Sequence, residues 1–197
     1  MSSLRKLQPY SIFKWLWPLV FISNVVGCSG EKTDRWKEQV LLVDGSVVVV
    51  QRTAQYVKGG PELAFNLSGG HIAGTSIVIP KQDGKSNFPE WSATIFSDYG
   101  FPEVPIVVDF KNASPEIYTA MLEPSRCMRY RRYVLAESSW KEKEIDFSSV
   151  SLKTNLLIDV DDSPKVVDVG LKARLNSDSR IQDYYRSVDA ASRCIDK

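Results

Sequence analysis

Short apolar and β-branched runs recur along the chain, and each is ended by glycine, proline, asparagine or aspartate. Runs of this length with this punctuation are typical of antiparallel strands. The clearest pair is 37–43 and 46–52, joined by Asp44 and Gly45, which can supply the positive φ angles of a type I′ hairpin turn. Further runs lie at 63–67, 75–79, 91–96, 106–110, 117–122, 130–136, 144–147 and 156–160. We therefore expect a mainly β fold, a single antiparallel β meander or sandwich.

Two segments modify this expectation. Residues 47–50 are apolar at every position, which predicts a strand covered on both faces. From Ser177 onward, apolar positions follow each other at spacings of three and four, which predicts a C-terminal α-helix with Ser177 as its cap. These positions are Ile181, Tyr184, Tyr185, Val188 and Ala191. Residues 169–175 fit either a strand or a helix, and we favour a helix.

The N-terminal segment has the layout of a bacterial lipoprotein signal. Arg5, Lys6 and Lys14 precede an apolar run, and the run ends in Val-Val-Gly-Cys at residues 25–28. Trp15 to Gly27 spans 13 residues, whereas a membrane-spanning helix needs about 20. We expect residues 1–27 to be removed and Cys28 to carry a diacylglycerol thioether and acyl chains such as palmitate. A plain secretory signal peptide, or an uncleaved anchor with an incidental cysteine, is the alternative.

The signal predicts how the rest of the chain is organised and where it resides. Residues 28–35 are expected to form a polar tether, and 36–197 a single β-rich domain. The acyl chains at Cys28 would hold the protein on a lipid bilayer in the cell envelope. Ser29 stands where well-studied Gram-negative lipoproteins carry aspartate as an inner-membrane retention signal. This similarity implies the outer membrane, with the domain facing the periplasm.

The charge balance argues against nucleic acid as a partner. The chain has 25 basic and 24 acidic residues, and three of the basic ones lie in the signal segment. The remainder is therefore slightly acidic, unlike a nucleic-acid-binding domain.

The cysteines fit an oxidising compartment. With Cys28 acylated, Cys127 and Cys194 remain as an even pair, which predicts a disulfide. Closing a loop of this length stabilises the fold by roughly 4 kcal/mol in the chain-entropy model. Two buried free thiols are the alternative. Two cysteines and one distant histidine make no zinc spacing, so we expect no metal and no cofactor.

The densest basic segment is the candidate binding surface. It consists of Arg126, Arg129, Tyr130, Arg131, Arg132 and Tyr133. Guanidinium groups beside aromatic rings suit phosphates or carboxylates, such as those of lipopolysaccharide, peptidoglycan or an envelope protein. A charged edge strand that prevents sheet-to-sheet aggregation is the alternative interpretation.

Residues suited to catalysis are sparse. His71 is the single histidine, it follows Gly69 and Gly70, and no Gly-x-Ser-x-Gly elbow occurs. Ser68 and Ser76 lie near it in the sequence without a recognisable motif. Asp159, Asp161 and Asp162 lack the glycine and glutamate of an EF-hand loop. Glu142 and Glu144 could imitate a glycosidase pair, but alternating charge of this kind is typical of an exposed hairpin.

The chain resembles a family of uncharacterised proteobacterial exported proteins and lipoproteins. The residues that carry the resemblance are 36–45 (WKEQVLLVDG), the valine-rich strand through Arg52, residues 105–110, residues 152–157 and Cys194. The resemblance covers about 36–194 and implies one exported β-rich domain without an assigned activity. We expect a non-catalytic envelope lipoprotein that binds a partner or has a structural role. A periplasmic envelope hydrolase and a periplasmic inhibitor or immunity protein are the alternatives.

Overall fold

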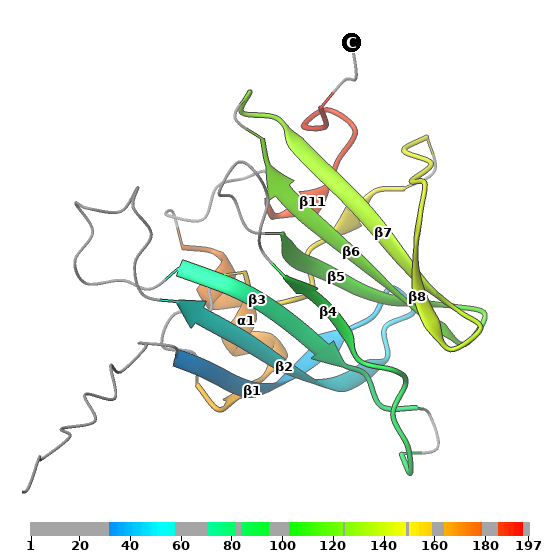
Figure 1. Cartoon of the computed structure of the whole chain (residues 1–197), viewed down its shortest axis with the longest axis vertical. Helices are drawn as coiled ribbons and strands as arrows, with labels where there is room; N and C mark the ends of the chain where they lie inside the picture. The colour runs from blue at the N-terminus through cyan, green and yellow to red at the C-terminus, as the bar shows by residue number, and fades with distance from the viewer. Residues whose placement is uncertain are drawn as a thin grey trace, which may run out of the picture.

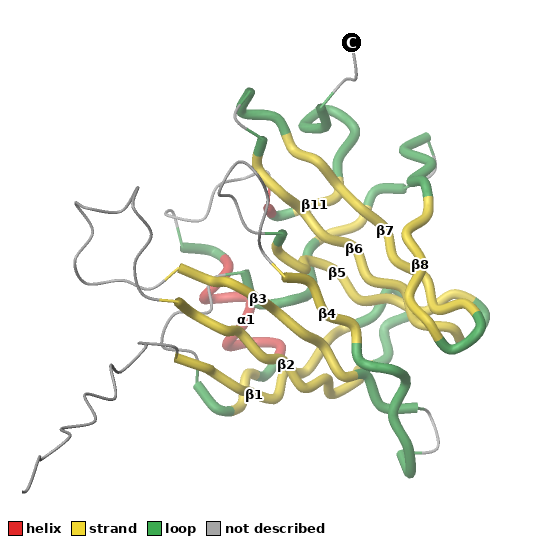
Figure 2. The backbone as a smooth tube through the Cα atoms, viewed as in Figure 1, coloured by secondary structure: helices red, strands yellow, loops and turns green. Residues whose placement is uncertain are grey.

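The computed structural model describes residues 32–57, 71–81, 84–94, 103–123, 125–148, 150–158, 164–178 and 185–194. Within these residues the chain is mainly β, with antiparallel sheets and a short helix near the C-terminus, as the sequence predicts. Figure 1 shows the two larger sheets, and Figure 2 shows how little helix accompanies them.

The first sheet has five strands in the order β10-β1-β2-β3-β4. Their bounds are Val166–Val167 (β10), Lys32–Leu41 (β1), Val47–Val57 (β2), His71–Val78 (β3) and Trp91–Thr94 (β4). All pairs are antiparallel except β1 with β10, which run parallel. Because β1 begins at Lys32, part of the segment expected to be a polar tether is strand.

The β1–β2 hairpin forms where the sequence places it, but its turn is of another kind. Gly45 has a φ of 84°, while Asp44 is not among the residues with positive φ. Gly45 N donates to Leu42 O and Leu42 N donates to Ser46 O, which encloses a three-residue loop. This is the geometry of a turn ended by a left-handed glycine, so the expected type I′ turn is wrong here.

The second sheet is a four-stranded antiparallel meander, β5-β6-β7-β8. Its strands are Val104–Lys111 (β5), Ser114–Leu122 (β6), Met128–Ala136 (β7) and Ser139–Lys143 (β8). The two-residue turns at Asn112-Ala113 and Glu137-Ser138 have positive φ at both positions. Both have the φ signs of type I′ turns, and neither contains glycine.

The two sheets pack face to face around a shared core. Val40, Val50, Ile77 and Trp91 of the first sheet belong to one buried cluster with Val108 and Ile117 of the second. The ring of Trp91 meets Tyr133 edge-on, with centroids 5.4 Å apart. Side chains two apart along a strand share a face, so β1 contributes Trp36, Glu38 and Val40 to this side, and Leu42 follows directly after the strand.

The second sheet is covered on its other face as well. Tyr118, Ala120, Met128 and Tyr130 pack there against Val188. Val188 belongs to a small antiparallel sheet formed by Leu152–Lys153 (β9) and Ser187–Val188 (β11). The central strand β6 is therefore buried along most of its length, with six consecutive buried residues.

The expected positions of helix and of two-sided burial are confirmed only in part. Residues 169–175 are helical, within α1 (Val169–Asn176). The second predicted helix is wrong where it can be checked, because Ser187 and Val188 pair with β9; residues 179–184 lie outside the described part. Val47 and Val49 are exposed on the outer face of the first sheet, so that strand is not covered on both sides.

Candidate functional site: an apolar cavity beside helix α1

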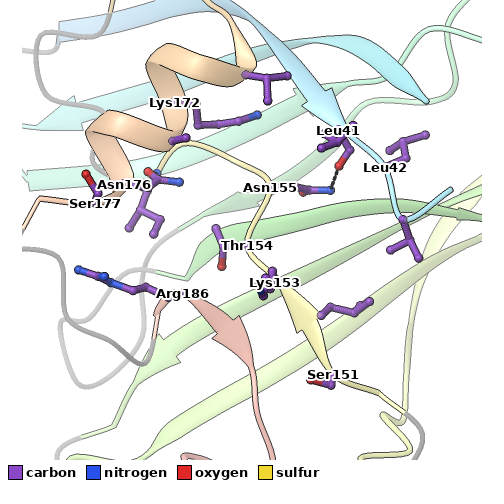
Figure 3. Close-up of a pocket in the computed structure, with 15 residues that line it drawn as sticks. Leu41, Leu42, Ser151, Lys153, Thr154, Asn155, Lys172, Asn176, Ser177 and Arg186 are labelled. Carbon is purple, nitrogen blue, oxygen red and sulfur yellow. Dashed lines mark hydrogen bonds between the residues drawn. The ribbon is translucent and has the colours of Figure 1, made fainter. Parts of the chain in front are cut away.

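A cavity of about 720 Å³ opens between the end of β1, the segment 151–158 and α1. Figure 3 shows Asn176 and Ser177 on the helix side, Leu41 and Leu42 on the strand side, and Thr154 and Asn155 between them. The lining is mostly apolar. Its apolar side chains are Leu41, Leu42, Val43, Leu152, Ile158, Val169 and Ala173.

Asn155 fixes the floor of the cavity. Its Nδ2 donates to Val108 O at 2.7 Å and to Leu41 O at 3.0 Å, and its Oδ1 accepts from Val108 N at 2.9 Å. One side chain thus ties β1 of the first sheet to β5 of the second. The segment that carries Asn155 continues into the core, where Leu156 and Leu157 are fully buried.

One face of α1 forms the helical wall. The helix begins after Asp168, whose Oδ1 accepts a hydrogen bond from Leu171 N at 2.7 Å, the usual role of an N-cap. Val169, Lys172, Ala173 and Asn176 line the cavity, and their spacing of three and four places them on one side. Asn176 donates to Leu156 O and accepts from Ile158 N, which fastens the end of the helix to the floor.

A buried ionic cluster lies under this wall. Glu38 accepts from Arg52 and lies 3.1 Å from the Nζ of Lys172. It also accepts hydrogen bonds from Trp36 Nε1 and Leu157 N. Burial alone would raise the pKa of Glu38, but Arg52 and Lys172 together hold it below its usual 4.5. The guanidinium of Arg52 also stacks over the ring of Trp36 at 4.9 Å.

The polar side chains of the cavity mostly serve the fold. Lys172 donates to Gln39 O as well as to Glu38, and Thr154 Oγ1 donates to Tyr185 O. Burial holds the pKa of Lys172 below its usual value, and Glu38 opposes that effect. The cation of Lys172 is thus partly neutralised within the protein.

Two further cations stand at the cavity, on the side of the small sheet. Lys153 is exposed on β9, and Arg186 directly precedes β11, where its carbonyl accepts from Thr154 N at 3.0 Å. Among the described lining residues there is no aspartate or glutamate. The described wall therefore combines apolar surface with basic side chains, and the Arg186 guanidinium also donates to Asp178 O at 3.3 Å.

The arginine-rich candidate surface lies elsewhere, mainly on β7. Arg129 pairs with Glu123 at 2.6 Å, Arg131 with Glu103 at 3.4 Å and Arg132 with Glu116 at 2.6 Å. Arg126 is exposed in the preceding turn with a φ of 62°. Each arginine of the strand thus already has a carboxylate partner, which weakens the segment as an anion site.

The two tyrosines of that segment are structural in their contacts. Tyr130 is buried against Phe147, with ring centroids 6.1 Å apart. The Tyr133 hydroxyl donates to Glu103 at 2.8 Å, and burial raises the pKa of Tyr133 to about 12. The binding role of residues 126–133 stays a prediction.

The predicted disulfide is confirmed. Cys127 and Cys194 are bonded, with their α-carbons 4.9 Å apart. Met128 N also donates to Ser192 O, and Cys194 N donates to Met128 O. The C-terminal segment is therefore fastened to the start of β7 by both covalent and hydrogen bonds.

The other residues singled out from the sequence are not brought together. Cys28, Ser68, Asp159, Asp161 and Asp162 lie outside the described residues, as does the side chain of His71. Ser76 lies on β3, and Glu142 and Glu144 are exposed, with Glu142 3.9 Å from Arg131. No cluster of three or more histidine, cysteine or acidic side chains suited to a metal ion occurs in the described ranges.

Sequence reasoning missed Lys153, Arg186 and the role of Leu41 and Val43 at the cavity. The nearest signal was the apolar run at 47–50, which from the sequence alone predicts burial. Leu41 and Val43, on the same hairpin, are 45% and 70% exposed. Such exposure is typical of surfaces that bind a ligand or partner.

Comparisons with known proteins leave the site to be interpreted from its own geometry. None of the helices in the described part of the chain is long and apolar enough to cross a bilayer. The chain matches no model of a protein family, no curated protein and no solved structure.

Proposed function

We propose that the protein is a lipid-anchored component of the bacterial cell envelope whose β-rich domain acts by binding rather than by catalysis. The anchor is Cys28, acylated after removal of residues 1–27, and the outer membrane facing the periplasm is the proposed location. The support for the anchor is the sequence of residues 1–28.

The composition of the cavity carries the proposal for binding. Catalysis needs several polar groups aimed at one reacting atom. Here Asn155, Asn176 and Thr154 direct their polar atoms at the protein's own backbone, while apolar atoms make up most of the exposed surface of the cavity. A largely apolar pocket with few polar groups is the usual form of a small-molecule binding site.

Acylation is tested by metabolic labelling with a fatty acid. The wild-type protein should incorporate label and sediment with membranes, whereas Cys28→Ser should do neither. Label retained in the Cys28→Ser protein would contradict the anchor. Separation of inner from outer membranes then tests the location.

The non-catalytic role is tested with His71→Ala, which removes the single histidine of the chain. A deletion strain carrying this variant should behave as one carrying the wild-type gene. Loss of the phenotype in a variant that melts at the wild-type temperature would favour the hydrolase alternative instead.

A further inference from the structure

We propose that the outer face of the first sheet lies flat on the lipid bilayer that holds the anchor. This face is the side of β1, β2 and β10 that is turned away from the core shared by the two sheets. Its apolar side chains would enter the membrane interface, with Arg35 and Lys37 at lipid phosphates. The inference rests on the proposed anchor at Cys28 and adds how the domain stands on its membrane.

Exposed apolar side chains are concentrated on this face. Leu41 pairs with Val47 in the β1–β2 ladder, and Val49 lies two residues further along β2, so the three share one side. Six large apolar side chains are exposed in the described ranges, and five of them lie on this face or directly at its end. The other two of the five are Val166 and Val43. Such clustering marks a surface that meets an apolar partner or a membrane.

The same face carries two cations. Arg35 and Lys37 are exposed and alternate along β1 with buried residues, which places them on the outer side. Lys37 lies opposite Val166 of β10, which is 62% exposed. Glu90 lines the same hollow as both cations and lowers the positive charge there by one. Basic side chains beside an apolar surface are typical of faces that lie in the plane of a membrane interface.

The anchor is too close to β1 for the domain to stand away from the bilayer. Only residues 29–31 separate Cys28 from Lys32, where β1 begins. Four steps of fully extended chain span at most about 14 Å. The start of β1 is therefore held within that distance of the acylated residue.

The position of the apolar patch favours a flat arrangement over an upright one. Val49 lies opposite Gln39, seven residues after Lys32, which is roughly 23 Å along β1. An upright sheet would hold Val49 clear of the lipid and leave the patch in water. A sheet that lies on its outer face buries the patch and still satisfies the short connection to the anchor.

The test uses the full-length acylated chain in vesicles of phosphatidylethanolamine and phosphatidylglycerol. Val49→Cys is labelled with a nitrobenzoxadiazole fluorophore, and Lys141→Cys, exposed on β8 of the second sheet, is the matched control. The introduced cysteine is the one free thiol, because Cys28 is acylated and the other two cysteines are bonded to each other. Lipids with a nitroxide in the upper acyl chain should quench the label at position 49 several-fold more than the label at position 141.

A second variant asks whether the apolar patch causes the docking. Val47→Glu places a carboxylate beside position 49 and should remove most of the quenching there. Ser139→Glu, which is also exposed but lies on β8, should leave the quenching unchanged. Both positions are on the surface, so melting temperatures close to that of the parent protein are expected.

Charge reversal tests the part played by the cations. Arg35→Glu combined with Lys37→Glu should lower the quenching at position 49 by about twofold or more in these vesicles. Lys141→Glu combined with Lys143→Glu makes the same change of charge at exposed sites of β8 and should have no effect.

Each outcome decides one part of the proposal. Quenching at Val49→Cys no stronger than at Lys141→Cys overturns the flat arrangement. A blue-shifted label at position 49 that nitroxide lipids do not quench, and that depends on protein density, shows a second copy of the chain on this face and overturns the bilayer as its occupant. Quenching that ignores the double charge reversal overturns the role of Arg35 and Lys37. A failed anchor is seen separately, because an unacylated Cys28 incorporates no fatty acid and takes up the fluorophore itself.

Discussion

Glu38 on β1 and Lys172 on α1 meet in an ion pair of 3.1 Å that is almost completely withdrawn from water. Arg52 approaches the same carboxylate from β2, also at 3.1 Å. Buried pairs are costly to desolvate, and their loss is costly when one partner is left behind. The pair therefore fixes where α1 stands beside the sheet, and with it the width of the cavity.

The first prediction concerns Glu38 and acid. Its pKa lies below 4.5 because two cations outweigh the effect of burial, so the unfolded chain binds this proton first as the pH falls. The stabilisation is complete above about pH 4.5 and is lost below it. Glu38→Gln should lower the unfolding free energy by about 3 kcal/mol at pH 7 and flatten its dependence between pH 5 and 3. Glu90→Gln, at an exposed site, is the control for urea titrations at each pH.

The second prediction concerns Asn155. Asn155→Asp removes both donors and places a carboxylate against Leu41 O and Val108 O, so we expect a loss of about 3 kcal/mol at pH 7. Protonation would restore one donor, so the loss should be smaller at pH 4. Thermal melts of this variant and of Asn87→Asp, which is exposed, provide the measurement. An equal loss in the two variants would show that Asn155 does not join the sheets.

The third prediction concerns the turns. Ala113 and Ser138 hold φ angles of 62° and 69°, which cost an L-residue roughly 1 kcal/mol or more. Ala113→Gly and Ser138→Gly should each raise the melting temperature, although the greater freedom of glycine in the unfolded chain offsets part of the gain. Gly45→Ala, at a φ of 84°, should lower it. Calorimetry of the three variants checks the signs.

The fourth prediction concerns the disulfide. Cys194→Ala should lower the unfolding free energy by about 3 kcal/mol because the unfolded chain is no longer cross-linked. The hydrogen bonds between Met128 and the C-terminal segment remain, so the circular dichroism spectrum should not change. Reducing agent should lower the melting temperature of the wild-type protein and leave that of the variant where it is. A further drop in the variant would contradict this account.

Much of the fold was predictable because its signals are local. The first hairpin and most of the short strands depend on nearby residues, and the cysteine pair depends on an even number of free cysteines. The strands predicted at 144–147 and 156–160 are wrong where they can be checked, because residues 144–147 and 156–158 lie outside any strand. The type of the first turn was not predictable, because Asp-Gly occurs both in two-residue type I′ turns and in three-residue loops that end in a left-handed glycine. The hydrogen bond from Leu42 N to Ser46 O decides between them. The helical spacing from Ser177 failed at Val188 because pairing with Leu152 decides its state.

The site was less predictable because its parts are distant in the sequence. Lys153 looks like any surface lysine until β11 is placed beside it. The arginines of β7 look available until their partners on neighbouring segments, Glu123, Glu103 and Glu116, are known. The apolar run at 47–50 predicted burial on both faces, which is wrong because Val47 and Val49 are exposed on the outer face of β2.

The two-sided burial of β6 has a consequence for the order in which the chain can fold. One of its faces is covered by Val188, near the end of the chain, and the disulfide that holds this region needs Cys194. A ribosome delivers these residues after β6. Until Val188 is present the cover over Tyr118 and Ala120 is incomplete, and until residues 166–167 are present the edge of β1 lacks β10. The second sheet therefore cannot complete its folding before the C-terminal segment is present. A chain truncated anywhere before Val188 should expose apolar surface, aggregate and be sensitive to proteases.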